Sequence, residues 1–387
     1  MFFLRLGVTA FGGPAAHIAI MEDELVRRRK WLSREQFLDL LGASNLIPGP
    51  SSSELAIHIG YLLAGWPGLL VAGICFILPA ALMVCGLAWA YVRFGNLPAT
   101  SAVLYGVKPL VIAVILQALW GLGKTAVKTP ALAGIGLASI AALSFFGLHP
   151  LLLLAVAGTF AVVLSEINGR RGRTQVACAA PLLLPPKGSS AAASLATVTA
   201  GAAAVVAPFT LGSLFLVFLK LGAIVFGSGY VLLAFLHNDF VAHRGWLTDI
   251  QLADAVAVGQ VTPGPVFTTA TFIGYVLGGV RGAIVATVGI FLPAFLLVAA
   301  SGPLVPRIRK SRIASAFLDG VNIASLALMA VVTWQLGRAS LVDVETAALA
   351  VASLIVLLRF RVNSLWLVLG GAVIGLLTHE VHLHLVR

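Results

Sequence analysis

Two prolyl-glycyl-prolyl turns are the places where this sequence could do chemistry. They are Pro48-Gly49-Pro50 and Pro263-Gly264-Pro265, and both lie in apolar sequence. Proline removes a backbone donor and ends a helix, and glycine adopts dihedral angles that other residues avoid. A break of this kind inside a membrane is tolerated only where protein or a water-filled cavity surrounds it. The two turns therefore predict two broken helices at membrane depth.

The helix that leaves each turn would begin with unpaired N–H groups and a positive dipole end, which together suit an anion. Hydroxyl and amide groups near the two turns would add donors, and the glycines of an earlier break in each half complete the expected site. Matched breaks in two halves of a chain favour a transport site over simple tight turns with serine caps. The expected anion ligands besides the turns are Gly12, Gly13, Asn45, Ser51, Ser52, Ser53, Gly227, Gln260, Thr268 and Thr269.

Two basic residues, Arg5 and Lys220, occupy the same position in the two halves, each in an apolar segment. A cation inside a membrane is costly and usually faces a pathway. Arginine can bind an oxyanion with two hydrogen bonds, whereas lysine acts as a point charge. The alternative is that both side chains extend to the membrane surface.

Four further residues are candidates for proton coupling. Glu54 lies three residues after Ser51, so it could complete a capping box, or it could exchange protons with His58 at the next turn of the helix. Asp39 and Asp254 form a matched pair before the two breaks, where they could pair with Arg5 or Lys220 or face water. His17 reads as a buried histidine with satisfied hydrogen bonds.

The composition sets the fold class. The chain has 387 residues, of which 60% are hydrophobic and 10% are charged. Long continuous apolar runs exclude a membrane β-barrel, whose strands alternate, and predict an all-α polytopic membrane protein. The three cysteines are isolated, so they indicate neither a disulfide framework nor a metal site. The net charge of +11 first indicates cytoplasmic loops and lipid head groups.

The chain is an internal duplication, because residues 2–166 align with about 217–380. Before the prolyl-glycyl-prolyl turn the alignment pairs Trp31 with Trp246, which we call the first register. After the turn it shifts by a single position and pairs Gly60 with Gly274, which we call the second register. We predict an N-terminal repeat at 1–167, a basic linker with an unpaired transmembrane helix at 168–210, and a C-terminal repeat at 211–387.

Each repeat predicts the same series of elements. A first apolar segment (2–21 or 211–236) is broken at glycines, and a short helix leads to the turn. The helix after the turn (51–64 or 266–278) falls short of the roughly 20 residues that a span needs, so it predicts a re-entrant hairpin. Full-length spans follow at 67–92, 103–123, 130–146 and 149–166, with partners at 281–302, 315–336, 345–358 and 363–380.

The distribution of lysine and arginine predicts that the two repeats have opposite topology. The loop at 27–34 is strongly basic in the first half, whereas its counterpart carries only Arg244. The loop before Arg312 reverses that bias, and it alternates at each later loop. The basic stretch 168–187 is predicted to be cytoplasmic and 190–210 to span the membrane. If the glycine-broken first segment of each half also re-enters rather than spans, the N-terminus lies in the cytoplasm and the C-terminus in the periplasm.

Together these motifs resemble the chromate ion transporter family, in its long two-domain type. The resemblance covers nearly all of the chain outside 168–210. Departures lie mainly in the second half, where Gly227-Ser228-Gly229 replaces a Gly-Gly-Pro. The resemblance implies a bacterial inner-membrane protein that expels chromate and confers resistance. The motifs that carry it are Phe11-Gly12-Gly13-Pro14, His17, Trp31, 45–50, 52–60, Leu78-Pro79, Phe226-Gly227, Trp246, 263–265 and Gly274.

The resulting hypothesis is an oxyanion transporter that works by alternating access. Protons are the candidate coupling ion. A carrier of sulfate or another tetrahedral oxyanion is the alternative. An intramembrane enzyme acting on lipid-linked substrates is disfavoured, because no nucleophile–base constellation is recognisable. The expected partners are the oxyanion, protons, membrane lipids and a second copy in a homodimer, with no nucleic acid, cofactor or metal.

Overall fold

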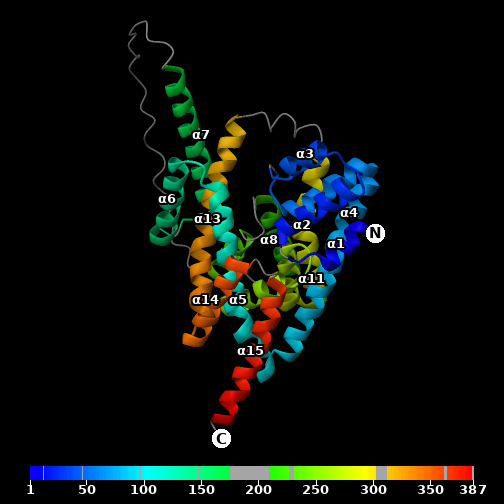
Figure 1. The fold of residues 1–387 in the computed structure, drawn as a ribbon, viewed down its shortest axis with the longest axis vertical. Coiled ribbons are helices and arrows are strands. Elements are labelled where there is room, and N and C mark those ends of the chain that lie inside the picture. Colours follow the sequence, from blue (N-terminus) through cyan, green and yellow to red (C-terminus); the bar gives the residue numbers. More distant parts are fainter. Residues whose placement is uncertain are drawn as a thin grey trace.

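The computed structural model is an all-helical bundle over the residues that it describes, and Figure 1 shows its arrangement. The described part of the chain is everything except 12, 46, 96, 147, 175–208, 226–230, 302–311, 361–363 and 386–387. Within it, five helices are long and apolar enough to cross a membrane. The prediction of an all-α polytopic membrane protein is confirmed.

The helices of the second half follow the same order along the chain as those of the first half. The first half contains α1 (Phe2–Thr9), α2 (Gly13–Glu22), the π-helix η1 (Asp23–Arg28), α3 (Arg34–Ser44), α4 (Ser51–Phe94), α5 (Pro98–Ala126), α6 (Pro130–Phe146) and α7 (Pro150–Thr174). The second contains α8 (Leu211–Ile224), α9 (Leu232–Leu236), the π-helix η2 (His237–His243), α10 (Asp249–Val261), the 3₁₀-helix η3 (Val266–Thr268), α11 (Thr269–Ser301), α13 (Arg312–Ser340), α14 (Val344–Phe360) and α15 (Ser364–Leu385).

Several helices run beyond the apolar stretches that predicted them. The predicted span at 149–166 continues as α7 to Thr174, so the helix extends into the basic stretch that was predicted to begin the linker, although Gly169 and Gly172 are weak helix formers. The predicted span at 190–210 lies outside the described residues except at its end. There Thr210 caps α8 by accepting a hydrogen bond from the Ser213 N–H at 3.0 Å.

The longest helices, α4 and α11, each contain a sharp reversal. The dihedral angles leave the helical region at Ala64-Gly65 in α4 and at Gly278-Gly279 in α11. A Cβ atom added to Gly60 would lie 2.3 Å from the carbonyl oxygen of Gly68. A straight helix would hold these two residues roughly 12 Å apart, so the chain doubles back. This agrees with the predicted short helices at 51–64 and 266–278.

The helices form two bundles, which lie side by side in Figure 1. The re-entrant bundle contains α1–α4 and α8–α11, in which α11 packs against α8 and α4. The long-helix bundle contains α5–α7 and α13–α15, in which α5 packs against α14 and α15 while α13 packs against α6 and α7. In Figure 1, α7 runs toward the top and α15, its counterpart in the second register, runs toward the bottom.

Glycine lets the long helices approach closely. A Cβ atom on Gly106 of α5 would lie 1.9 Å from the Gly371 carbonyl oxygen of α15, and one on Gly320 of α13 would lie 2.4 Å from the Ala157 carbonyl oxygen of α7. Small residues at such contacts are typical of helix packing in membranes, where lipid removes the hydrophobic drive for association. The second register relates the two contacts to each other.

Candidate functional site

The two prolyl-glycyl-prolyl turns each bond to the break in the opposite half. The Gly49 N–H donates to the carbonyl oxygen of Val225 at 2.7 Å, and the Gly264 N–H donates to that of Ala10 at 3.0 Å. Val225 follows α8 and Ala10 follows α1. The first register relates both donors and both acceptors of these bonds. The four broken segments therefore meet at the centre of the re-entrant bundle.

Glycine is required at both turns. The φ angle is +140° at Gly49 and +94° at Gly264, a region that side chains rarely tolerate. A Cβ atom on Gly264 would also lie 2.6 Å from the Cβ of Ala80. The prolines frame these turns, and Pro50, Pro263 and Pro265 are buried while Pro48 is half-buried.

The capping box predicted from Ser51 to Glu54 is not formed. The residue that caps α4 is Pro50, which has no side-chain acceptor and no N–H for a glutamate to bond. Ser51 is instead the first residue inside the helix. The Glu54 side chain is fully buried, and neither carboxylate oxygen has a hydrogen-bonding partner in the described part of the chain. Glu54 therefore remains available for another role.

Two more polar atoms near Glu54 share this condition. Ser53 Oγ and His58 Nε2 are buried without a hydrogen-bonding partner among the described residues. Glu54 and His58 do not bond to each other in this structure. Buried polar groups are nearly always satisfied by protein, water or a ligand. The part of α4 before its reversal at Ala64-Gly65, which we call the re-entrant arm, thus carries buried polar groups that a proton, a water or a bound molecule would have to satisfy.

His17 is satisfied, as predicted. Its Nε2 lies 3.1 Å from the carbonyl oxygen of Ala10 and its Nδ1 lies 3.2 Å from the Ser52 hydroxyl. A carbonyl can only accept, so Nε2 carries the proton, and in the neutral ring Nδ1 accepts from Ser52. The Ser52 proton is therefore donated to His17, and the hydroxyl is left with acceptor capacity only.

The corresponding groups of the second half are bonded locally. The Thr268 hydroxyl donates to the Pro265 carbonyl oxygen, and the Thr269 hydroxyl donates to that of Val266, both at 2.8 Å. Gln260 is half-buried, and its amide nitrogen lacks a partner among the described residues. The two helix starts are therefore unequal, although the turns that precede them are alike.

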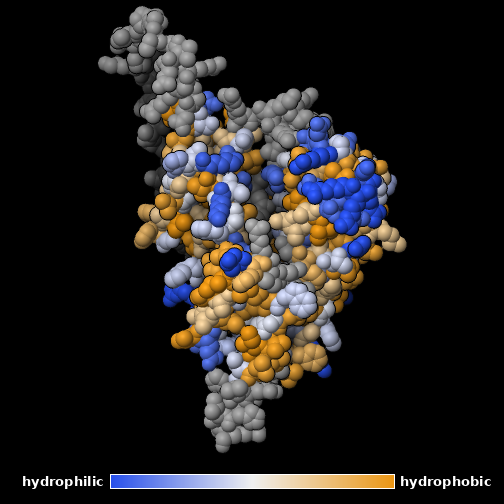
Figure 2. Space-filling view, viewed as in Figure 1, coloured by the Kyte–Doolittle hydropathy of each residue, from blue (hydrophilic) through white to orange (hydrophobic). Residues whose placement is uncertain are grey.

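A cavity of about 860 Å³ lies between the two bundles, beside the start of α4. Two predicted ligands, Asn45 and Ser51, line it from the re-entrant bundle. Figure 2 shows the hollow between the bundles, with hydrophilic residues on the face of the long-helix bundle. The polar residues that line it from that bundle, none of them singled out by the sequence, are Gln117, Lys124, Thr125, Lys128, Asp319, Asn322 and Ser325.

Cations and an unpartnered hydroxyl mark the far wall of this cavity. Lys128 pairs with Asp319 at 2.7 Å, and Lys124 lies 4.8 Å above the Trp120 ring. Ser325 is 1% exposed, and its hydroxyl has no hydrogen-bonding partner among the described residues. The cavity thus joins a helix N-terminus to a polar, positively charged wall.

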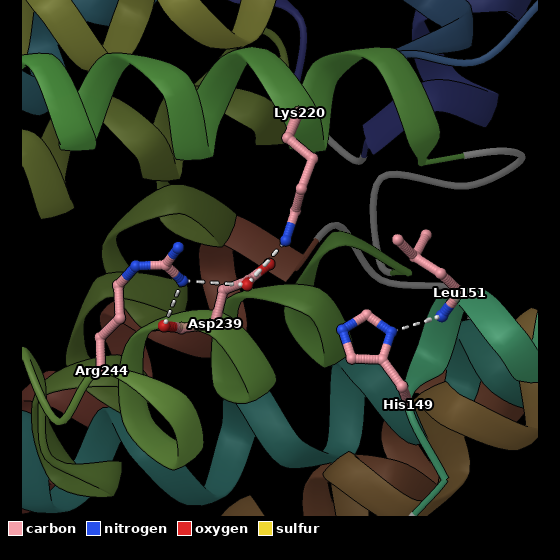
Figure 3. A network of polar contacts seen from close by, with 5 residues as sticks. All are labelled: His149, Leu151, Lys220, Asp239 and Arg244. Carbon is pink, nitrogen blue, oxygen red and sulfur yellow. Dashed lines mark hydrogen bonds and ion pairs between the residues drawn. The ribbon is translucent and has the colours of Figure 1, made fainter. Parts of the chain in front are cut away.

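Lys220 belongs to a charged cluster that Figure 3 shows. Its Nζ lies 2.8 Å from Asp239 Oδ1, which also pairs with Arg244 at 3.1 Å. The Asp239 side chain is 3% exposed, whereas that of Lys220 is 33% exposed. Sequence reasoning found the lysine and missed its buried carboxylate.

The first half contains a related cluster around Glu24. Arg29 bonds to Glu24 at 2.7 Å, and this bond, with Arg28 and Arg5 nearby, holds the pKa of Glu24 below its usual value. Arg5 is exposed on α1 and does not line the cavity. The first register relates Glu24 to Asp239 and Arg29 to Arg244, so the sequence did hold a signal for both clusters.

The two predicted aspartates lie in different environments. Asp254 on α10 pairs with Lys108 of α5 at 2.9 Å and accepts a hydrogen bond from the Tyr91 hydroxyl at 2.9 Å. The suggested pairing of Asp254 with Arg5 or Lys220 is wrong, because α10 packs against α5. Asp39 is exposed on α3.

The structure therefore gathers part of the predicted site. It brings the two turns together and places Asn45 and Ser51 on one cavity, but it leaves Arg5 and Asp39 on the surface. Gly13 begins α2 with a φ of +72°. Gly12 and Gly227 lie outside the described residues.

Comparisons with known proteins give one consistent result. A family model described as chromate transporter matches residues 1–162 and 212–376. A chromate transport protein of Cupriavidus metallidurans is 34% identical over 99% of this chain and 93% of its own length. One from Pseudomonas aeruginosa is 34% identical over 87% of this chain and 80% of its own length. An uncharacterized transporter of Bacillus subtilis is 32% identical over 41% of this chain and 90% of its own length. No solved structure matches the chain.

Proposed function

The chain belongs to the chromate transporter family, and we propose that it expels chromate from the cytoplasm through the cavity beside the start of α4. The protein is a chromate transporter of the multi-pass membrane class, which its five long apolar helices support. The observation that carries the proposed route is the cavity itself. It is the place where a predicted anion-binding helix start and a cationic wall face each other.

Chromate is a tetrahedral dianion, so the site must replace a strongly bound hydration shell. The first turn of α4 offers backbone N–H groups and the positive end of its dipole. Asn45 and Ser51 add an amide and a hydroxyl at the cavity wall. We assign Lys220, which does not line the cavity in this structure, to offset the desolvation of the anion by exchanging Asp239 for substrate during transport. Arg5, which was predicted to share this role, is exposed on α1 outside the cavity and is not assigned to it.

The proposed mechanism is alternating access between inverted repeats, with boundaries at 1–167, 168–210 and 211–387. The paired bonds from Gly49 to Val225 and from Gly264 to Ala10 support a twofold relation between the halves. The opposite directions of α7 and α15 in Figure 1 support the inversion. The accompanying location is a bacterial inner membrane, with the N-terminus in the cytoplasm and the C-terminus in the periplasm.

Proton coupling is proposed for Glu54. An ionised carboxylate buried without a partner costs several kcal/mol, and Glu54 lies at the arm of α4 that begins at the cavity. Binding a proton there removes the charge, and losing it beside a dianion is unfavourable. The protonation of Glu54 and the occupancy of the anion site would therefore depend on each other.

The deciding experiment is uptake of labelled chromate into inverted vesicles, with and without a proton gradient and with sulfate as competitor. Gradient-dependent uptake that resists modest sulfate supports the proposal. Sulfate flux without chromate flux would change the substrate and keep the oxyanion carrier. No flux of either ion would overturn the proposal.

A matched pair of variants tests the route through the cavity. Asn45→Asp places a negative charge on the cavity wall and should reduce chromate uptake. Gln335→Glu makes the same amide-to-carboxylate change at an exposed position of α13 that does not line the cavity. Equal uptake by the two variants would remove Asn45 from the route.

A further inference from the structure

The cavity has a repeat-related counterpart that is closed. A second crevice lies between α5, α10 and α13, and it holds no volume that a water molecule could occupy. Five of its lining residues have counterparts in the second register that line the open cavity. The closed set is Lys108, Val111, Ile112, Leu336 and Ser340, and the matching open set is Asn322, Ser325, Leu326, Leu122 and Ala126.

The two crevices lie toward opposite ends of the same helix pair. On α5 the closed crevice uses residues 108–115 and the open cavity uses 117–126. On α13 the order is reversed, because Ser325 lines the open cavity and Ser340 lines the closed crevice. These two serines are roughly 22 Å apart along the helix. The open cavity and the closed crevice therefore face opposite sides of the membrane.

Charge explains why only one crevice is closed. Lys108 and Asp254 join the two bundles across the closed crevice at 2.9 Å, and Tyr91 donates to the same carboxylate. The side chain of Lys108 is 17% exposed and that of Asp254 is 3% exposed, so water screens the ion pair weakly. The counterparts are Asn322 and Asp39, and an amide cannot form an ion pair with a carboxylate. Consistently, α10 packs against α5 and α13, whereas the principal partner of α3 is α4.

We propose that the Lys108–Asp254 pair, supported by Tyr91, is the gate that seals this transporter on the side opposite the open cavity. The inference rests on the proposed alternating access. In the opposite state the pair separates, α10 moves away from α5 and α13, and the crevice lined by Ser340 and Ala253 admits water. The repeat-related positions on the other side, Asn322 and Asp39, cannot form the same pair, so the Lys108–Asp254 pair favours the state seen here.

The test is the chemical accessibility of position 340, which requires no substrate. Ser340→Cys is introduced into a chain whose Cys75, Cys85 and Cys178 are replaced by alanine. A membrane-impermeant maleimide is then applied to vesicles of each orientation. Ser340 is 5% exposed, so labelling should be slow while the gate is intact.

Lys108→Met should raise the labelling rate at least tenfold from one side of the membrane only. Because that variant leaves a buried charge unpaired and could fail to fold, Lys108→Met with Asp254→Asn removes both charges and should give the same increase. Exchanging the two residues, Lys108→Asp with Asp254→Lys, should restore slow labelling. Arg281→Met is the matched control, since Arg281 is exposed and outside every ion pair found among the described residues.

Fast labelling of position 340 while the Lys108–Asp254 pair is intact would refute the proposed gate. Equal labelling rates in the neutral double variant and in the Arg281→Met control would also refute it. Chromate uptake by the parent chain is measured in the same vesicles. A chain that transports chromate while its gate variants label slowly would refute the gate and keep the proposed function. A chain that does not transport chromate would refute the function, whatever the labelling shows.

Discussion

Replacing Lys220 by methionine separates the two roles that this lysine could have. If Lys220 binds chromate, the change abolishes transport. If Lys220 only neutralises Asp239, the change harms the protein by leaving a buried carboxylate with fewer partners. Asp239 lies 2.8 Å from Lys220 and 3.1 Å from Arg244, and its side chain is 3% exposed.

The size of the stability effect follows from this geometry. Breaking a fully buried ion pair by removing one partner costs about 3–5 kcal/mol. The Lys220 side chain is 33% exposed and Arg244 still holds the carboxylate, so screening reduces the loss to about 1–3 kcal/mol. We therefore expect the Lys220→Met protein to insert, to lose a measurable part of its stability in detergent, and to lose chromate uptake.

The double variant Lys220→Met with Asp239→Asn decides between the roles. It removes the unpaired carboxylate, so stability should return toward that of the parent chain. Chromate uptake in inverted vesicles should remain absent if Lys220 contacts the anion. Recovery of uptake in the double variant would refute the assignment of Lys220 to the substrate and leave it a structural partner of Asp239. Arg281→Met, which removes an exposed cation, controls for the loss of one positive charge.

Two further predictions concern the centre of the re-entrant bundle. Gly264→Ala should sharply reduce the yield of folded protein on size-exclusion chromatography, because the new Cβ would lie 2.6 Å from that of Ala80 at a φ of +94°; Gly86→Ala, with open space around its Cβ position, should be neutral, and equal yields would contradict the role of the turn. Glu54→Gln should insert normally and keep chromate exchange without a gradient but lose its acceleration by a proton gradient, measured by vesicle uptake; an unchanged response to the gradient would exclude Glu54 as the coupling group.

The sequence predicted the breaks in the fold well, because the effect of proline and glycine is local. Gly49 and Gly264 occupy turns that need positive φ angles, and the reversals of α4 and α11 lie where the short apolar segments predicted them. The predicted capping box did not form, and the reason is also local. Pro50 takes the capping position and has no N–H to offer Glu54.

The sequence also contained a signal that was not used. Applying the first register to Glu24 leads to Asp239, just as it relates Asp39 to Asp254, the pair that was predicted. The register alone does not say which cation each carboxylate meets. Asp239 pairs within its own half, whereas Asp254 pairs with Lys108 from the other half.

By itself, the sequence determined that this chain is a duplicated, polytopic helical protein with two broken-helix turns, since apolar length and backbone restriction act over a few residues. Only the tertiary structure decided which charged residues pair with each other and which of the two crevices is open. The bonds from Gly49 to Val225 and from Lys108 to Asp254 join residues far apart in the chain. Inside an apolar bundle a polar group depends on whichever partner packing brings within hydrogen-bond reach, and packing is a property of the whole fold.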